Sequence, residues 1–492
     1  MDMKKKEEIQ KLKNSMKKAN ISKEKQEIVI TDFKETQEKE KTMKIAVKEG
    51  SAWGVMNGMG ESYISPFALS LNANNFQISL LSSIPGLISP VSQIFGSKLI
   101  EKYSRRKIVT TSILFQALMW IPLLLLGLLF WKNIFANNLP IILIIFYSIY
   151  AILGAIGQPA WFSLMGDIVP EKIRGKYFSE RSRIINIVIL ISTLTGAFIL
   201  DYFKTKGFVL IGFSIIFFIA CLGRLFSVSY LKKYYDPKIE LKKGYYFNFW
   251  QFVKKSPYNN FGKFTIYSGL IYFGTLIAGP FFAVYMLRDL GFSDTTLGYT
   301  IFMLINISTI VYTFLFMPIL GKFADKYGNK ELLKIGGILL PLLPVMWLFS
   351  KNPWYLALVA QLVAGLAWAA FNLASGNFIY DSVTPQRRAI CVTYYNIFIG
   401  VGTFLGATVG GLLAQYASIT FMNKLLFIFL ISGIVRAIVS VIMLPKIKEV
   451  RNVKKVKYYP GFYFRELNPM RGIRYGLGNN VNVLKRKLKF FK

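Results

Sequence analysis

The sequence predicts an all-α polytopic membrane protein with twelve transmembrane helices, arranged as two pseudo-symmetric halves of six helices. Three observations lead to this prediction. Apolar residues gather in runs long enough to cross a bilayer, which takes about 20 residues. Lysine and arginine residues gather on alternate connections between these runs. Polar motifs in the first six runs recur in the last six.

Charged and apolar residues are segregated along the chain. Hydrophobic residues make up 53% of the 492 residues, yet 17% are charged and the net charge is +35. The resulting regions are a charged N-terminal tail (1–50), a six-helix half (51–231), a linker (232–263), a second six-helix half (264–444) and a basic C-terminal tail (445–492). Both tails resemble disordered or membrane-surface segments more than folded domains.

The distribution of basic residues orients the predicted spans. These spans cover residues 52–71, 78–97, 108–131, 139–165, 184–203, 207–231, 264–287, 295–320, 332–350, 354–379, 390–415 and 421–444. One side holds most loop lysines and arginines, including Lys98, Lys102, Arg106, Lys107, Lys176, Lys322, Lys330 and Arg387. The other side holds Lys132, Lys204, Lys206, Arg288, Lys351 and Lys424. By the positive-inside rule the richer side, with both termini, is cytoplasmic.

This pattern also indicates the partners. A basic chain can bind nucleic acid, but basic residues placed beside membrane spans indicate a bilayer with anionic headgroups instead. We expect a plasma membrane protein that works as a monomer and binds no nucleic acid. The chain has no histidine, and Cys221 and Cys391 lack the spacing of a metal site. We therefore expect no metal, no cofactor and no enzymatic activity.

Four polar segments reveal an internal repeat. "SKLIEKYSRRK" (97–107) and "GKFADKYGNK" (321–330) share an order of residue types, and "GDIVPEKIRGK" (166–176) and "YDSVTPQRRAI" (380–390) are a second such pair. Asp167 and Asp381 are separated by the same number of residues as Arg174 and Arg388. Six spans therefore recur as six spans.

At these residues the chain resembles the major facilitator superfamily, whose signature loop joins the second span of a half to the third. The second copy matches at Gly321, Phe323, Ala324, Asp325, Lys326, Tyr327, Gly328 and Lys330. The first copy has Ser97 and Ser104 in place of the glycines and Glu101 in place of the aspartate. The resemblance implies twelve spans and a central binding site that opens to one side at a time.

The resemblance also implies that these loops form a cytoplasmic gate, which latches the halves together in the outward-open state. We expect the gate residues to be Glu101, Arg105, Gly321, Asp325, Lys326, Gly328, Arg174 and Arg388. Gly328 can adopt the positive φ of a tight turn, and Asp325 can accept charge-assisted hydrogen bonds. The alternative is that the basic residues only fix the topology.

In this family the cavity lies between spans one, four, seven and ten, which carry polar and aromatic stripes here. The expected binding residues are Trp53, Asn57, Glu61, Gln158, Trp161, Tyr272, Trp368 and Asn372. Such faces suit a small hydroxylated or amphipathic solute. The alternative is that these side chains tie helices together, as polar residues commonly do in membranes.

Glu61 is the only carboxylate that we place near the middle of a span. An acidic residue there costs about 2.5 to 3.5 kcal/mol on insertion scales. Burial favours its protonated form, so it can couple transport to protons. Alternatively it binds sodium or a cationic solute, or it is structural. For the intramembrane Arg224 and Arg436 we favour a structural contact or snorkelling over anion binding.

Glycines at 402, 406, 410 and 411 have the spacing of a close helix crossing. Together, these features predict a secondary active transporter that moves a small solute by alternating access and is coupled to protons through Glu61. A uniporter, a multidrug exporter and a non-transporting membrane sensor are the alternatives. The solute and the direction of transport do not follow from the sequence.

Overall fold

The computed structural model describes residues 14, 22–237 and 248–453, and these residues form helices and connections without a β-strand. The first half contains α2 (Lys23–Met59), η1 (Glu61–Tyr63), α3 (Ile64–Ser70), α4 (Asn75–Leu99), α5 (Arg105–Leu118), α6 (Trp120–Trp131), η2 (Ala136–Asn138), α7 (Leu139–Ile168), α8 (Glu171–Thr205) and α9 (Val209–Leu231). Short helix α10 (Phe249–Lys255) precedes the second half.

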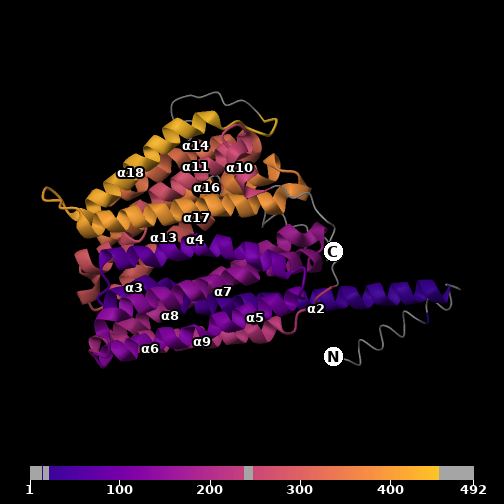
Figure 1. The fold of residues 1–492 in the computed structure, drawn as a ribbon, viewed down its shortest axis with the longest axis horizontal. Helices are drawn as coiled ribbons and strands as arrows, with labels where there is room; N and C mark the ends of the chain where they lie inside the picture. The colour runs from indigo at the N-terminus through magenta and orange to yellow at the C-terminus, as the bar shows by residue number, and fades with distance from the viewer. Residues whose placement is uncertain (1–13, 15–21, 238–247, 454–492) are drawn as a thin grey trace, which may run out of the picture.

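The second half is also built of consecutive helices. It contains α11 (Asn260–Ala278), α12 (Phe281–Val284), η3 (Tyr285–Asp289), η4 (Phe292–Asp294), α13 (Gly298–Tyr327), α14 (Asn329–Met346), α15 (Pro353–Tyr355), η5 (Leu356–Ala360), α16 (Gln361–Ser382), α17 (Pro385–Tyr416), α18 (Lys424–Met443) and η6 (Leu444–Lys446). Figure 1 shows the halves as two adjacent bundles, with α4 of the first beside α17 of the second.

Ten helical segments of the described chain are long and apolar enough to cross a membrane. They correspond to all predicted spans except 52–71 and 332–350. The first exception is interrupted at Gly60, where α2 gives way to η1. The second is α14, whose first turns carry Lys330, Glu331 and Lys334. The all-α membrane fold is confirmed, while the count of twelve spans stays a prediction.

The N-terminal tail differs from the expectation in its described part. Helix α2 begins at Lys23 and continues through residue 50 into the first span, so that it projects from the bundle in Figure 1. Specific polar contacts hold its middle against α8 and α9. Glu49 is 5% exposed; it pairs with Arg181 at 3.1 Å and accepts a hydrogen bond from Ser227 at 2.8 Å. Residues 1–13, 15–21, 238–247 and 454–492, which include most of the C-terminal tail, lie outside the described residues.

The predicted close crossing of glycines is confirmed at α17. A Cβ atom added at Gly402, Gly406 or Gly410 would lie 2.1 Å from a backbone oxygen of α11. On another face, a Cβ at Gly400 would lie 2.7 Å from the backbone oxygen of Gly86 in α4. Helix α17 therefore packs closely against its own half and against the other half at the same time.

Candidate solute-binding site

A cavity of 530 Å³ lies between the two halves. Its polar lining comes from several helices. The first half contributes Asn57, Ser62 and Asn186, and the second half contributes Asn306, Gln361 and Trp368. Such a volume, walled by apolar side chains with a few polar groups, is typical of a small-molecule site.

Glu61 does not line this cavity but contacts Asn57, which does. Its carboxylate accepts hydrogen bonds from residues of two spans. The break in helix α2 occurs at Gly60, where an added Cβ would lie 2.3 Å from the ring of Trp120. Glu61 accepts hydrogen bonds from Asn57 Nδ2 at 2.5 Å and from the Tyr150 hydroxyl at 2.6 Å. Because Asn57 lines the cavity, it connects the carboxylate to the cavity wall.

The predicted binding residues separate into two groups. Asn57 and Trp368 line the cavity, Tyr272 packs on Trp368 with ring centroids 5.9 Å apart, and Glu61 contacts Asn57. The other four predicted residues are not in the cavity lining. Trp53 packs against a buried core formed by both halves, and Gln158 accepts a hydrogen bond from Gln93 at 2.9 Å. The ring centre of Trp161 lies 4.8 Å from the Arg181 guanidinium, and Asn372 is exposed on α16.

The cavity wall also differs from the expected four spans. No residue of α7 is in its lining, whereas α8, α13 and α18 contribute residues. Tyr150 of α7 is connected to the cavity wall through its hydrogen bond to Glu61. Asn186, Asn306 and Arg436 line the cavity although they were not predicted to be binding residues. The sequence carries a weak signal for two of these residues. Asn186 and Arg436 are polar residues in apolar spans, and the equivalent positions of the other half are Asn396 and Arg224.

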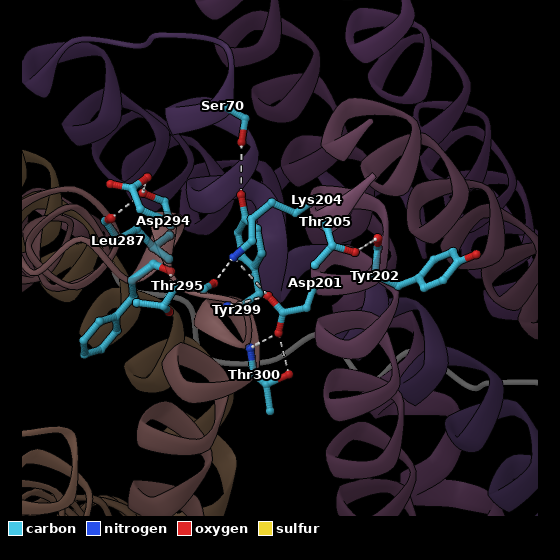
Figure 2. Close-up of polar contacts among 12 residues, drawn as sticks. Ser70, Asp201, Tyr202, Lys204, Thr205, Leu287, Asp294, Thr295, Tyr299 and Thr300 are labelled. Carbon is cyan, nitrogen blue, oxygen red and sulfur yellow. Dashed lines mark hydrogen bonds and ion pairs between the residues drawn. The ribbon is translucent and has the colours of Figure 1, made fainter. Parts of the chain in front are cut away.

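Asp201 joins the two halves at the end of the bundle opposite the basic loops. This carboxylate, at the end of α8, is 3% exposed. It accepts hydrogen bonds from the backbone amides of Tyr299 and Thr300 at 3.0 and 2.9 Å and from the Thr300 hydroxyl at 2.7 Å (Figure 2). The N-cap residue of α13, Leu297, makes no side-chain cap. An acid of one half therefore caps a helix of the other, where a negative charge is stabilising.

Further contacts join the halves at the same end. The Ser70 and Tyr299 hydroxyls lie 3.4 Å apart, Lys204 Nζ donates to the backbone oxygen of Thr295, and Asn75 Nδ2 donates to the backbone oxygen of Ala414 at 3.0 Å. Figure 2 shows the first two of these contacts around Asp201. We call this set the Asp201 seal. It joins the two halves on the side away from the basic loops.

At the basic end, the charged networks around Arg105 and Arg451 each lie within one half. In the first half, Arg105 is 1% exposed; it pairs with Asp167 at 2.5 Å and with Asp236 at 3.5 Å. In the second half, Arg451 pairs with Asp381 at 2.7 Å and with Asp325 at 3.5 Å. Each network contains the aspartate at the end of the fourth span of its half, Asp167 or Asp381. The cation differs: Arg105 lies in the loop between the second and third spans, whereas Arg451 follows the last span of the second half.

The other predicted gate residues have these positions. Arg174 donates to the backbone oxygen of Gly166 at 2.8 Å, and Arg388 donates to that of Tyr380 at 3.4 Å. Lys326 lies 4.6 Å from the ring centre of Tyr327, and Glu101 is exposed in the turn after α4. The predicted turn at Gly328 has a φ of 90°, while Gly321 lies inside α13 beside open space. The equivalent contacts of Arg174 and Arg388 repeat the sequence duplication in space.

Fold and site together define a polytopic helical protein with two repeated halves around a polar cavity. Residues 52–308 and 264–458 match the family model for the Major Facilitator Superfamily, and the chain belongs to this family. Membership of this family points to a transporter and not an enzyme.

Curated relatives and solved structures agree with this family. A 100-residue segment is 29% identical to a vacuolar membrane amino acid uptake transporter, fnx2, of Schizosaccharomyces pombe. It spans 20% of this chain and 17% of that relative's length. The fold is similar to a variant of the nucleoside transporter NupG, with a TM-score of 0.61, 16% identity and coverage of 84% and 100% of the two chains. A D-xylose-proton symporter gives a TM-score of 0.58 at 16% identity, with coverage of 84% and 99%.

Proposed function

We propose that this protein is a secondary active transporter that moves a small solute across the plasma membrane by alternating access. The proposal is carried by a difference between the two ends of the bundle in the polar contacts that join the halves. The Asp201 seal connects them at one end of the cavity, while the charged networks of Arg105 and Arg451 stay within their own halves at the other. This is the arrangement expected of an inward-facing state, with the basic end in the cytoplasm.

The coupling step is assigned to Glu61. Its two oxygens accept hydrogen bonds from an amide N–H and a hydroxyl O–H. These are donors, whereas a sodium site would need several oxygen atoms directed at the ion. The donors argue against a sodium site, so exchange of a proton at Glu61 is the coupling step in this proposal. Asn57, which contacts Glu61 and lines the cavity, connects that step to the cavity wall. The predicted symport with protons therefore stands as the preferred mechanism.

Uptake into proteoliposomes tests the transport proposal. The purified protein is reconstituted and offered a panel of labelled sugars, amino acids, carboxylic acids and nucleosides. Uptake is measured with and without a pH gradient in which the outside of the vesicle is acidic, so that protons flow inward. We expect one class to accumulate only with the gradient. Equilibration without accumulation would support a uniporter, and export of hydrophobic cations would support a multidrug exporter. If no compound moves in either direction, the protein is better explained as a membrane sensor.

Thiol labelling tests the orientation. Single cysteines at Lys102 and Lys322 report on the basic end, and cysteines at Lys132 and Lys351 report on the opposite end; all four side chains are exposed. We expect a membrane-impermeant maleimide added to intact cells to label Lys132→Cys and Lys351→Cys only. Labelling of Lys102→Cys or Lys322→Cys from outside would reverse the proposed topology.

A further inference from the structure

The two arginines buried in the bundle are equivalent in the repeat but differ in their partners. In the first half, Arg224 donates from Nε and Nη2 to Gln116 Oε1 at 2.9 and 2.5 Å and from Nη1 to Ser227 Oγ at 3.3 Å. Ser227 in turn donates to Glu49 Oε1 at 2.8 Å. The Ser227 hydroxyl thus links this cation to a carboxylate through two hydrogen bonds, and each guanidinium nitrogen has an acceptor.

Arg436 in α18 has no such compensation. It is 2% exposed, and it donates only to two backbone oxygens, those of Leu340 at 3.0 Å and Thr275 at 3.3 Å. Its Nε has no acceptor in the described part of the chain, and none of the described carboxylates forms an ion pair with it. A buried charge without a partner is costly. A structural role alone does not account for this cation.

The position of Arg436 suggests what its partner is. Arg436 and Thr275 both line the cavity between the halves. The Thr275 hydroxyl is also buried without a partner among the described residues. An unused Nε–H on the guanidinium and an unused hydroxyl on the neighbouring Thr275 are two free donors in one part of the cavity wall. The planar guanidinium suits a carboxylate, which can accept two hydrogen bonds from it.

We propose that Arg436 and Thr275 bind the carboxylate group of the transported solute, so that the substrate is a small carboxylic acid or an amino acid. This inference rests on the proposed transport function, because it takes the cavity to be the solute site. One guanidinium balances the single charge of a carboxylate, whereas a phosphate monoester would bring more negative charge than this wall offers. The second half thus supplies the anion site, and the first half supplies the coupling carboxylate Glu61.

Binding to the purified full-length protein tests the inference without requiring transport. Thermal stabilisation is titrated with a panel of amino acids and mono- and dicarboxylic acids, each paired with its methyl ester, alongside sugars, nucleosides and phosphate monoesters. We expect at least one acid to bind roughly tenfold or more tightly than its ester, since charge-assisted hydrogen bonds are lost in the ester. The proposal is overturned if no acid is preferred over its ester, or if a phosphate monoester or a neutral compound binds best.

Variants at Arg436 and Thr275 test whether these residues cause the preference for the acid over its ester. Arg436→Gln should abolish the preference for the acid, Arg436→Lys should retain part of it, and Thr275→Val should weaken acid binding by a few-fold to tenfold. Arg224→Gln is the matched control, because it removes the equivalent arginine of the other half and should leave acid binding unchanged. If Arg436→Gln does not fold, Thr275→Val still decides, since retained wild-type affinity in that variant would contradict the proposed pair.

The two proposals fail in different ways. An acid that binds through Arg436 but is not taken up by proteoliposomes would remove the transport proposal and keep the anion site. Accumulation of a solute without an anionic group would keep the transport proposal and remove the anion site.

Discussion

Asp201 Oδ2 lies 2.9 Å from the backbone nitrogen of Thr300, and this contact joins the last turns of α8 in one half to the first turn of α13 in the other. The same carboxylate accepts the amide of Tyr299 and the hydroxyl of Thr300. Because the acceptor and the donors belong to different halves, the bonds can exist only while the halves are together at this end. The Tyr299 ring adds an edge contact with Phe213 of the first half, with ring centroids 5.8 Å apart.

We expect Asp201→Asn to open this end of the transporter. The amide loses the negative charge and one of the two acceptor oxygens, so the closed form should lose about 1.5 to 3 kcal/mol. A cysteine in the cavity at Ser65, with Cys221 and Cys391 replaced by alanine, should then react with an impermeant reagent from outside roughly tenfold faster. Asp294→Asn is the control, because among the described residues the Asp294 side chain accepts a hydrogen bond from its neighbour Ser293 and none from the other half. Equal rates in wild type and Asp201→Asn would show that the seal does not hold the halves.

Glu61→Gln should abolish accumulation of the solute driven by a pH gradient while still permitting exchange. The amide keeps the shape of a protonated carboxyl group but cannot release a proton. Counterflow and gradient-driven uptake in proteoliposomes separate the two activities. Glu180→Gln, at an exposed carboxylate, is the control and should behave as wild type.

Two other outcomes at Glu61 are informative. Complete loss of solute binding in Glu61→Gln would make the carboxylate a direct ligand of a cationic solute. Normal gradient-driven accumulation would leave Glu61 as a structural acceptor for Asn57 and Tyr150.

Asp325→Asn should lower transport and favour the inward-facing form if this residue latches the halves in the outward-open state. In the present state Asp325 is 80% exposed, and its ion pair among the described residues is with Arg451, so breaking that pair alone should have a small effect. The informative comparison is Arg451→Gln, which removes the partner and leaves Asp325 charged. If both variants slow uptake equally, Asp325 acts within its own half and the latch hypothesis is wrong.

Much of the fold follows from features that the sequence carries locally. Long apolar runs define the spans, the glycine spacing in α17 defines its crossing with α11, and a glycine at 328 permits the turn with positive φ. These features depend on neighbouring residues along one helix. The helical N-terminal segment was not predicted, because Glu49 is held by Arg181 and Ser227 from distant helices and not by an apolar stripe.

The site was predicted less completely. A helical stripe shows which residues share a face but not toward which neighbour the face is turned, so Gln158 and Asn372 were expected in a cavity that they do not line. The roles of Asn186, Asn306 and Arg436 depend on the rotation of α8, α13 and α18. Asp201 was not selected because its partners are backbone amides of the other half, which no sequence pattern identifies.

Distances between spin labels test alternating access most directly. Labels at Lys132 and Lys351 measure the separation of the halves at the sealed end, and labels at Lys102 and Lys322 measure it at the basic end. Each pair is measured by double electron–electron resonance in reconstituted wild type and in Asp201→Asn. The account predicts that Asp201→Asn lengthens the distance between 132 and 351 and shortens the distance between 102 and 322. A longer distance at the sealed end with an unchanged distance at the basic end would contradict it.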